Sequence, residues 1–248
     1  MIKVKSATDI EKARVAGKVV GLLLKGIAER IKPGISTMSL DNFAYDFIKE
    51  SGGEPAFLGY LGYPKTICAS VNSEVIHGIP SNRVLREGDI IGIDVGVKAE
   101  GFYSDAAVTV RVGRVSEKAD RLIRTAEEAF FEALALAKPG MRLSNISHAI
   151  QSYVEGKGYS VVKAFVGHGI GRKLHEEPQI PNYGLPGRGP KLKKGYMLAI
   201  EPMVNEGTDE TMVLEDRWTA RTVDNKLSSH FEHTIVITDK GAEILTLA

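Results

Sequence analysis

The chain repeats a pattern along its length. The tripeptide Lys-Pro-Gly occurs at 32–34 and again at 138–140, and the residues that follow keep a similar apolar pattern. Each copy comes after a helical pattern and is followed by a second amphipathic stretch that glycine closes. We therefore expect two similar halves, each built of two helices and strands, packed around a pseudo-two-fold axis.

The helices that precede the two copies have recognisable starts. The first should cover about residues 8–31, opened by Thr8 with Glu11 three residues later, which is the spacing of a capping box. The second should cover about residues 117–137 and begin after Ser116, because serine is a favoured N-cap residue.

The strands also repeat, and each copy carries an acidic residue at the same place. LREGDIIGID at 85–94 is similar to LKKGYMLAIE at 192–201, and SDAAV at 104–108 aligns with FEHTI at 231–235. The acids that match are Asp94 with Glu201 and Asp105 with Glu232. Two such pairs should meet near the axis between the halves.

The hairpin at 91–110 places two of these acids in the middle of strands, where carboxylates are uncommon. A turn centred on Ala99 and Glu100 would put Asp94 directly opposite Asp105, with Cβ atoms roughly 4.5–5.5 Å apart. At that distance one acid takes a proton or a cation lies between them. Two aspartates at strand ends that face water are the alternative.

Four carboxylates in one pocket require positive charge, and divalent metal supplies it economically. His168, in a Gly-His-Gly turn after an apolar run, is the candidate nitrogen ligand. Such an oxygen-rich site favours Mn, Fe or Co, while Zn in a carboxylate-bridged pair stays open. His77 and His175 each precede a turn that contains proline and could donate hydrogen bonds to a substrate in the same cavity. The remaining histidines are expected to be structural or on the surface: His148, His230 and His233.

Composition excludes several classes of protein. The chain has 248 residues, 43% of them hydrophobic and 25% charged, and a net charge of +1, which is not the basic character of a nucleic-acid binder. Cys68 is the single cysteine, so no disulfide can form within the chain. No secretory leader and no membrane-spanning run is apparent, and we expect a cytoplasmic protein. A dinucleotide-binding loop at 167–171 fails on its glycine spacing.

Six motifs, taken together and in order, resemble the methionine aminopeptidase family in its short, bacterial type I form. They are HGIP at 77–80, IDVG at 93–96, SDAA at 104–107, GHGIGRKLHEEP at 167–178, AIEPM at 199–203 and FEHTIVIT at 231–238. The resemblance covers nearly the whole chain. It implies an α+β, pita-bread fold, with residues 1–248 forming a single catalytic domain of two pseudo-symmetric halves around a curved antiparallel sheet.

The resemblance also implies a set of functional residues. Two divalent metal ions would be held by Asp94, Asp105, His168, Glu201 and Glu232, with Asp105 and Glu232 shared between them. Glu201 would act as the general base, and His77 and His175 would face the substrate. A pocket for the methionine side chain would use Tyr60, Tyr63, Cys68 and Trp218, with Phe57 and Leu174 nearby. Leu61 and Leu174 depart from the histidine and phenylalanine that many bacterial members carry.

The implied activity is removal of the initiator methionine from nascent polypeptide N-termini with a small second residue. The implied protein is a monomer that visits the ribosome surface, with no nucleic-acid binding of its own and no membrane association. The Pro- and Gly-rich loop at 181–195 would either rim the site or only connect elements on the surface. Two other functions stay open, an X-Pro peptidase and a non-catalytic relative that binds partners or RNA.

Overall fold

The computed structural model describes residues 2–248. The elements that precede residue 112 are two helices followed by strands. They are α1 (Ala7–Ala28), α2 (Thr37–Glu50), β1 (Glu54–Pro55), the 3-10 turn η1 (Tyr60–Gly62), β2 (Ile67–Val71), β3 (Glu74–Ile76), β4 (Ile90–Ala99) and β5 (Phe102–Arg111).

The rest of the chain begins again with two helices. The elements are α3 (Glu117–Leu136), α4 (Leu143–Gly156), β6 (Ser160–Val161), β7 (Val166–Gly169), β8 (Glu176–Pro181), β9 (Met197–Ile200), β10 (Met203–Asn205), β11 (Thr211–Val213), β12 (Ala220–Thr222), β13 (Ser228–His230), β14 (Glu232–Thr238) and β15 (Gly241–Ile244). None of the helices within residues 2–248 has the length and apolar character that crossing a bilayer requires.

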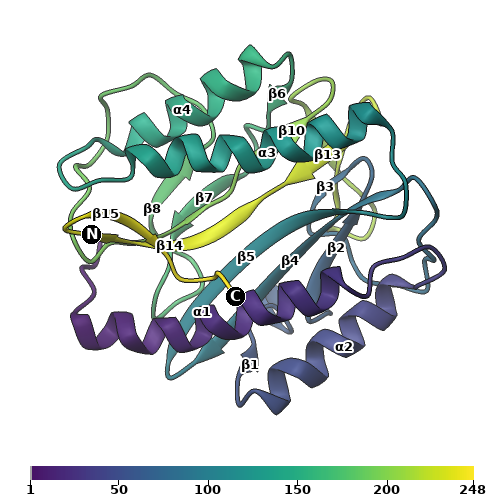
Figure 1. Ribbon diagram of the computed structural model, residues 1–248, viewed down its shortest axis with the longest axis horizontal. Helices are drawn as coiled ribbons and strands as arrows, with labels where there is room; N and C mark the ends of the chain where they lie inside the picture. Colours follow the sequence, from purple (N-terminus) through teal and green to yellow (C-terminus); the bar gives the residue numbers. More distant parts are fainter. Residues whose placement is uncertain (1) are drawn as a thin grey trace.

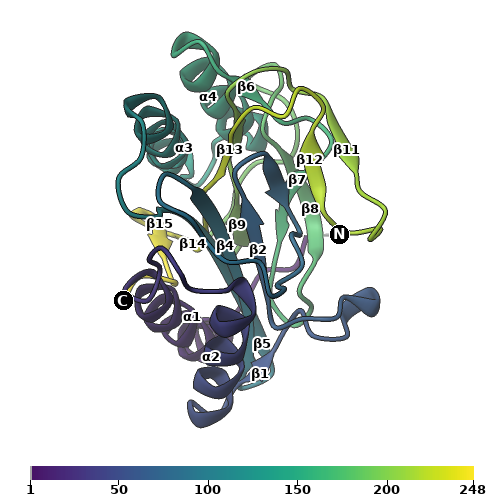
Figure 2. The ribbon, with the colours of Figure 1, turned by 90° about the vertical axis from the view of Figure 1, so that its right-hand side faces the viewer.

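A nine-stranded antiparallel sheet forms the centre of the molecule. Its strands follow the order β1-β4-β5-β14-β9-β7-β8, with β2 paired to β4 and β15 paired to β14. The helices lie to one side of this sheet, α1 and α2 over the first half and α3 and α4 over the second (Figures 1 and 2). This is the α+β arrangement that the sequence predicts.

Alternation along the strands decides which side chains meet the helices. On β4, Ile91, Ile93 and Val95 are fully buried in the core that also contains α1 and α2. Asp94 lies between them in sequence and therefore projects from the opposite face. The face that the helices leave free is thus the one that carries the acids.

The two Lys-Pro-Gly segments take the same structure in both halves, which confirms the repeat. Gly34 and Gly140 have φ angles of +93° and +84°, a region that favours glycine. The N–H of Gly34 donates to the carbonyl oxygen of Leu85 at 2.9 Å, and that of Gly140 donates to Leu192 at 2.9 Å. Both bonds connect the loop after the first helix of a half to the segment that leads into β4 or β9, the strands of the LREGDIIGID and LKKGYMLAIE repeats.

The start of α1 differs from the prediction, and that of α3 agrees with it. Ser6, not Thr8, caps α1, and its side chain accepts the N–H of Asp9 at 3.1 Å. The carboxylate of Asp9 accepts the N–H of Ser6 in return, which completes a capping box two residues earlier than expected. Ser116 caps α3 as predicted.

The register of the β4–β5 hairpin also differs from the prediction. Glu100 and Gly101 form the turn, with φ angles of +51° and +78°, because a two-residue hairpin turn of this type needs positive φ at both positions. Asp94 therefore pairs with Ala107, and Gly96 pairs with Asp105. A shift of the pairing by two keeps both acids on the same face, as diagonal rather than direct neighbours.

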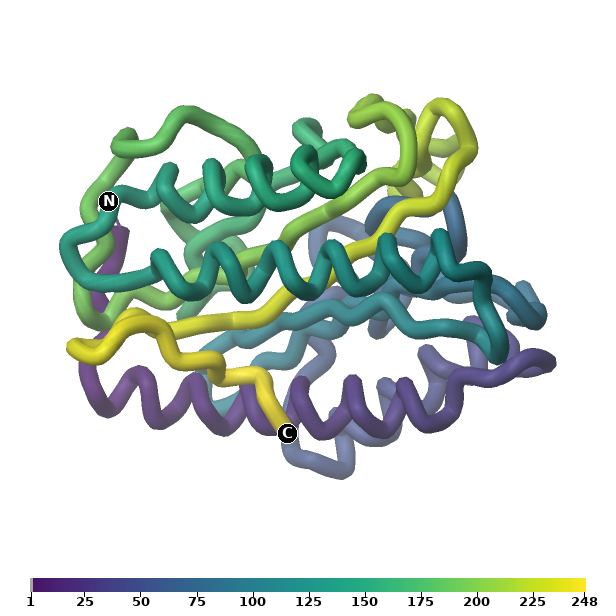
Figure 3. Tube along the Cα trace, turned by 45° about the horizontal axis from the view of Figure 1, so that its top comes forward, coloured from purple at the N-terminus to yellow at the C-terminus, as the bar shows by residue number. Residues whose placement is uncertain are grey.

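The C-terminal segment lies across α1 and depends on two glycines of that helix (Figure 3). A Cβ atom at Gly17 would lie 2.3 Å from the carbonyl oxygen of Leu245, and one at Gly21 would lie 2.7 Å from that of Thr246. The N–H of Leu245 donates to Thr234 on β14 at 2.9 Å. The segment thus joins the first helix to the central strand of the sheet.

Candidate metal and substrate site

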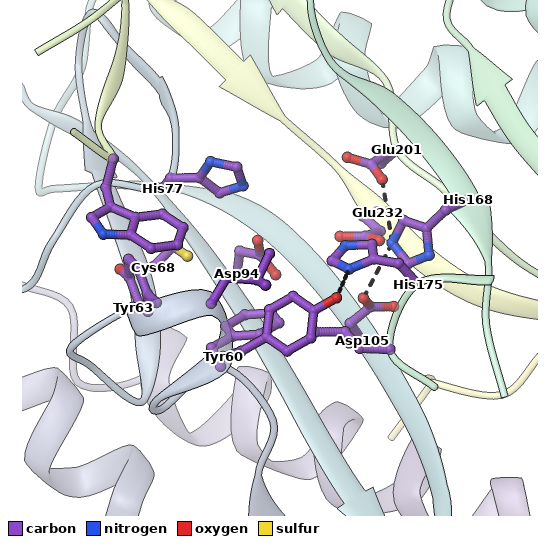
Figure 4. A pocket seen from close by; sticks show the side chains of 14 residues that line it. Tyr60, Tyr63, Cys68, His77, Asp94, Asp105, His168, His175, Glu201 and Glu232 are labelled. Atoms are coloured by element: carbon purple, nitrogen blue, oxygen red, sulfur yellow. Dashed lines mark hydrogen bonds and ion pairs between the residues drawn. The ribbon is translucent and has the colours of Figure 1, made fainter. Parts of the chain in front are cut away.

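Four neighbouring strands bring the predicted acids together. Asp94 lies on β4, Asp105 on β5 and Glu232 at the start of β14, and Glu201 directly follows β9. All four line one cavity of about 160 Å³. Figure 4 shows Asp105, Glu201 and Glu232 near His168, and Asp94 on the side of His77 and Cys68. Each half of the chain contributes two acids, as the repeat predicts.

Glycines on both sides allow His168 to reach this group. A Cβ at Gly167 would lie 2.5 Å from the carbonyl oxygen of Ala199, and one at Gly169 would lie 2.1 Å from that of Glu177. The strands β7, β8 and β9 can therefore pack this closely only because residues 167 and 169 are both glycine. The Gly-His-Gly sequence is thus explained by packing beside His168.

The orientation of His168 leaves its Nε2 atom directed at the acids. Its Nδ1 atom lies 2.9 Å from the carbonyl oxygen of Gly169, so Nδ1 carries the proton. Nε2 lies 3.5 Å from Asp105 Oδ2 and 3.7 Å from Glu201 Oε1. A second bond that fixes the ring and its tautomer is typical of histidines that bind metal.

The chemistry of this group fits divalent metal. Ligand atoms of Asp105, His168 and Glu232 all lie within 4.8 Å of one another. Burial raises the pKa of Asp94, Glu201 and Glu232 well above the usual range of carboxyl groups. Although burial alone would lower it, the carboxylates of Asp105 and Glu201 raise the pKa of His168 to about 9.

One imidazolium does not balance four carboxylates. Moreover, Asp94 Oδ1 is buried and has no hydrogen-bond partner among residues 2–248. An uncompensated buried carboxylate oxygen is unfavourable, and a cation in the cavity would satisfy it. The five predicted ligands thus line one cavity, and three of them, Asp105, His168 and Glu232, lie close enough together to hold one ion.

Asp105 is held by the central strand. The Thr234 hydroxyl lies 3.2 Å from Asp105 Oδ1 and 2.8 Å from its carbonyl oxygen, and it accepts the N–H of Asp105 at 3.0 Å. Thr234 follows Glu232 by two residues on β14 and so lies on the same face. These contacts fix the spacing between the two acids.

His77 and His175 face the same cavity from opposite sides. His175 is exposed at the mouth, and its Nδ1 atom lies 2.8 Å from the Tyr60 hydroxyl. The His77 ring packs edge-on against Trp218, and burial lowers its pKa to about 4. His77 also has a φ of +59°, and the next residue must be glycine because a Cβ at Gly78 would lie 2.5 Å from the Ala69 carbonyl oxygen.

The other end of the cavity is apolar. Tyr63 and Trp218 meet edge-to-face with ring centroids 5.1 Å apart, and the buried Cys68 lies beside them. The cavity is completed by the remaining residues predicted for the methionine pocket, Tyr60, Phe57 and Leu174. Leu61 also lines it, but that side chain is 81% exposed and forms part of the rim.

Sequence reasoning missed His230. It was expected to be structural or superficial, yet its Nε2 atom lies 3.8 Å from both Glu201 and Glu232 and has no hydrogen-bond partner among the described residues. Burial lowers its pKa to about 3. His230 ends β13 and Glu232 begins β14, so only their separation of two in the sequence was available as a signal. His233 is buried and bonds Thr246, and His148 is exposed on α4, as expected.

The loop at 181–195 does not rim the cavity. No residue of this range lines it, and the loop instead bonds to α4. Gly187 donates to Asn145 at 2.7 Å, and Arg188 donates to Ser144 at 2.7 Å. The alternative, a connection on the surface, is the one that the structure supports.

Comparison with known proteins agrees with this geometry. The model of metallopeptidase family M24 matches residues 11–239. Among curated relatives, methionine aminopeptidase 1 of Bacillus subtilis is 52% identical over 246 residues, which cover 99% of each chain. The methionine aminopeptidase of Escherichia coli is 46% identical and aligns with 99% of this chain and 94% of its own length.

Solved structures confirm the predicted pita-bread fold. The crystal structure of methionine aminopeptidase from Thermotoga maritima matches with a TM-score of 0.99 and 48% identity over 100% of both chains. Xaa-Pro dipeptidase from Bacillus anthracis shares the fold with a TM-score of 0.80, but this chain covers 62% of that one at 22% identity. The fold alone therefore extends to peptidases of other specificity.

Proposed function

Because this chain belongs to metallopeptidase family M24 and to its methionine aminopeptidases, we propose that it hydrolyses the first peptide bond of polypeptides that begin with methionine. The observation that carries the proposal is one cavity that joins five candidate metal ligands to an apolar pocket. Two divalent ions bound by these ligands would lower the pKa of a water molecule and polarise the scissile carbonyl. Their identity, among Mn, Fe, Co and Zn, is left to experiment.

We assign Glu201 the role of general base. Its Oε1 atom lies 3.7 Å from His168 Nε2 in the cavity, so its carboxylate is placed to reach a water molecule bound there and to take up a proton from it. Glu201 would remove a proton from the attacking water and later pass it to the leaving amine. The Asn182 side chain donates to the carbonyl oxygen of Glu201 at 3.0 Å and fixes its backbone.

His175 and His77 would bind the two sides of the scissile peptide. The Tyr60 hydroxyl can donate to Nδ1 of His175, which leaves the proton of a neutral ring on Nε2, ready to donate to the developing oxyanion. His77 is neutral at pH 7 because its pKa is about 4, so it can accept a hydrogen bond from the peptide N–H. Tyr63, Cys68 and Trp218 would contact the unbranched thioether side chain.

We propose that residues 1–248 act as one catalytic domain, as a monomer in the cytoplasm, on nascent chains whose second residue is small. Tyr60 and His175 both line the cavity and contact each other, with the Tyr60 hydroxyl 2.8 Å from His175 Nδ1. A visit to the ribosome surface follows from the family resemblance alone. The competing X-Pro function predicts a different substrate and is decided by the same assay.

The test is methionine release by protein stripped of metal and then supplied with Mn, Fe(II), Co or Zn. Met-Ala-Ser should be cleaved and Met-Leu-Ser much more slowly. Glu201→Ala should abolish release, whereas Asp239→Ala, which removes an exposed acid paired with Lys194, should leave it unchanged. Cleavage of Ala-Pro-Gly alone would assign the chain to the X-Pro branch, and no cleavage by folded protein would favour a binding role.

A further inference from the structure

One buried ion pair lies outside the cavity and has no part in the mechanism so far. Lys5 Nζ lies 2.7 Å from Glu176 Oε2, and the two side chains are 7% and 8% exposed. Removal of two charges from water is unfavourable, so a buried pair is weak evidence for stability alone. Glu176 directly follows His175, which places this pair next to the proposed catalytic residue.

The Glu176 carboxylate closes the loop that carries His175. Its Oε1 atom accepts the backbone N–H of Arg172 at 2.9 Å and that of Lys173 at 3.2 Å. The end of the loop is thereby bonded to its beginning, with Leu174 and His175 between. Leu174 is buried in the cavity wall, so any movement of this loop also changes the cavity.

Lys5 fixes the closed loop to the body of the molecule. Its backbone N–H donates to the carbonyl oxygen of Gly195 at 2.8 Å, and its side chain passes so near Gly171 that a Cβ there would lie 2.3 Å from Lys5 Cε. The carbonyl oxygen of Gly171 accepts the N–H of Tyr103 on β5 at 2.7 Å. The loop is therefore held between the N-terminal segment and the strand that carries Asp105.

We infer that Lys5 and Glu176 are positioning residues, which hold the His175 ring where it can donate to the scissile carbonyl. The inference rests on the proposed function, because it assigns His175 a role in the transition state. Displacement of a catalytic group by about 1 Å can lower the rate about 100-fold. Neither residue lines the cavity, and both act through His175.

The test compares Lys5→Met, Lys5→Arg and the doubly neutral Lys5→Met/Glu176→Gln with wild type. We expect kcat for Met-Ala-Ser to fall about 10- to 100-fold in Lys5→Met and in the double variant, with KM changed less than about threefold. Lys5→Arg should restore kcat to within about threefold, because it keeps the charge. The double variant guards against misfolding, since it leaves no uncompensated buried charge.

The control is Arg14→Met, which breaks a more exposed ion pair, between α1 and Glu243 on β15. This variant should lose thermal stability and keep the kcat of wild type. If Lys5→Met and the double variant behave like Arg14→Met, with lower melting temperature and unchanged kcat, the pair only stabilises the fold and the inference is wrong.

A second measurement does not depend on activity. In metal-free protein, the NMR resonances of the His175 imidazole report its bond to Tyr60, and they should shift in Lys5→Met and return in Lys5→Arg. Unchanged resonances in Lys5→Met would overturn the inference. If wild type releases no methionine, the proposed function fails, while the imidazole comparison still decides whether the ion pair places the ring.

Discussion

The close contact between α1 and the C-terminal segment gives a quantitative prediction for Gly17→Ala. The new Cβ would lie 2.3 Å from the Leu245 carbonyl oxygen and 2.8 Å from its carbonyl carbon. Both atoms are backbone, so no side-chain rotation relieves the overlap. The C-terminal segment must then move away from the helix.

The expected loss of free energy of unfolding follows from the contacts of the C-terminal segment that this movement would break. Leu245 is 5% exposed, and loss of its burial is worth about 1.5–3 kcal/mol. Its N–H bond to Thr234 and the bond between Thr246 and His233 add about 1 kcal/mol each. Alanine stabilises the helix by about 1 kcal/mol relative to glycine, which offsets part of the loss. We expect a net decrease of about 2–4 kcal/mol in the free energy of unfolding.

Urea unfolding followed by circular dichroism measures this difference, and Gly26→Ala is the matched control. Gly26 lies in the same helix, but its Cβ would meet only side chains that can move aside, the Phe43 ring at 3.3 Å and the Arg30 guanidinium at 3.9 Å. Gly26→Ala should therefore be neutral or slightly stabilising. A Gly17→Ala protein as stable as wild type would show that the C-terminal segment does not depend on this contact.

Three further predictions concern metal, acid and the core. Divalent metal at about 100 times its Kd should raise the free energy of unfolding by about 2.7 kcal/mol, as measured by thermal unfolding. The metal-induced increase should be smaller in Asp105→Asn. If this variant shows the same increase as wild type, the metal binds elsewhere. Although burial raises it, the bonds from Lys5, Lys173 and Arg172 lower the pKa of Glu176 below its ordinary 4.5. The Glu176 charge therefore stabilises the fold above about pH 4.5, and this stabilisation is lost as pH falls through the lowered pKa. The difference in free energy of unfolding between wild type and Glu176→Gln should shrink in acid titrations. A difference that does not depend on pH would contradict this prediction. Phe130 is fully buried and packs against Phe231 and His233. Phe130→Ala should lower the free energy of unfolding by about 3–5 kcal/mol, measured by urea unfolding. A loss under about 1 kcal/mol would mean that α3 repacks around the cavity.

The repeat made much of the fold accessible from the sequence. Matching Asp94 with Glu201 and Asp105 with Glu232 identified four residues from separate strands that the structure places in one cavity. This succeeded because equivalent strands of the two halves lie side by side in one sheet, β5 next to β14. The roles of these residues were implied by family resemblance and by charge, and they stay predictions here.

The errors have physical causes that local patterns do not reveal. The hairpin register depends on which residues adopt positive φ, and Gly101 was assigned to a strand although its freedom suits the turn. Ser6 and Thr8 are both acceptable caps, and the choice depends on which acid reaches back, Asp9 in this chain. His230 resembles a structural histidine in sequence, and its proximity to Glu201 arises only from the pairing of β13 with β10.

The position of β14 has a consequence for synthesis of the protein. This strand lies between β5 and β9, yet it follows both of them in the chain and leaves the ribosome after them. Until it emerges, β5 and β9 present open edges that can pair wrongly with other strands. Until β14 emerges, Glu232 is also missing from the cavity that the other acids line. The proposed metal site therefore stays incomplete until β14, which follows its other four ligands in the chain, has been synthesised.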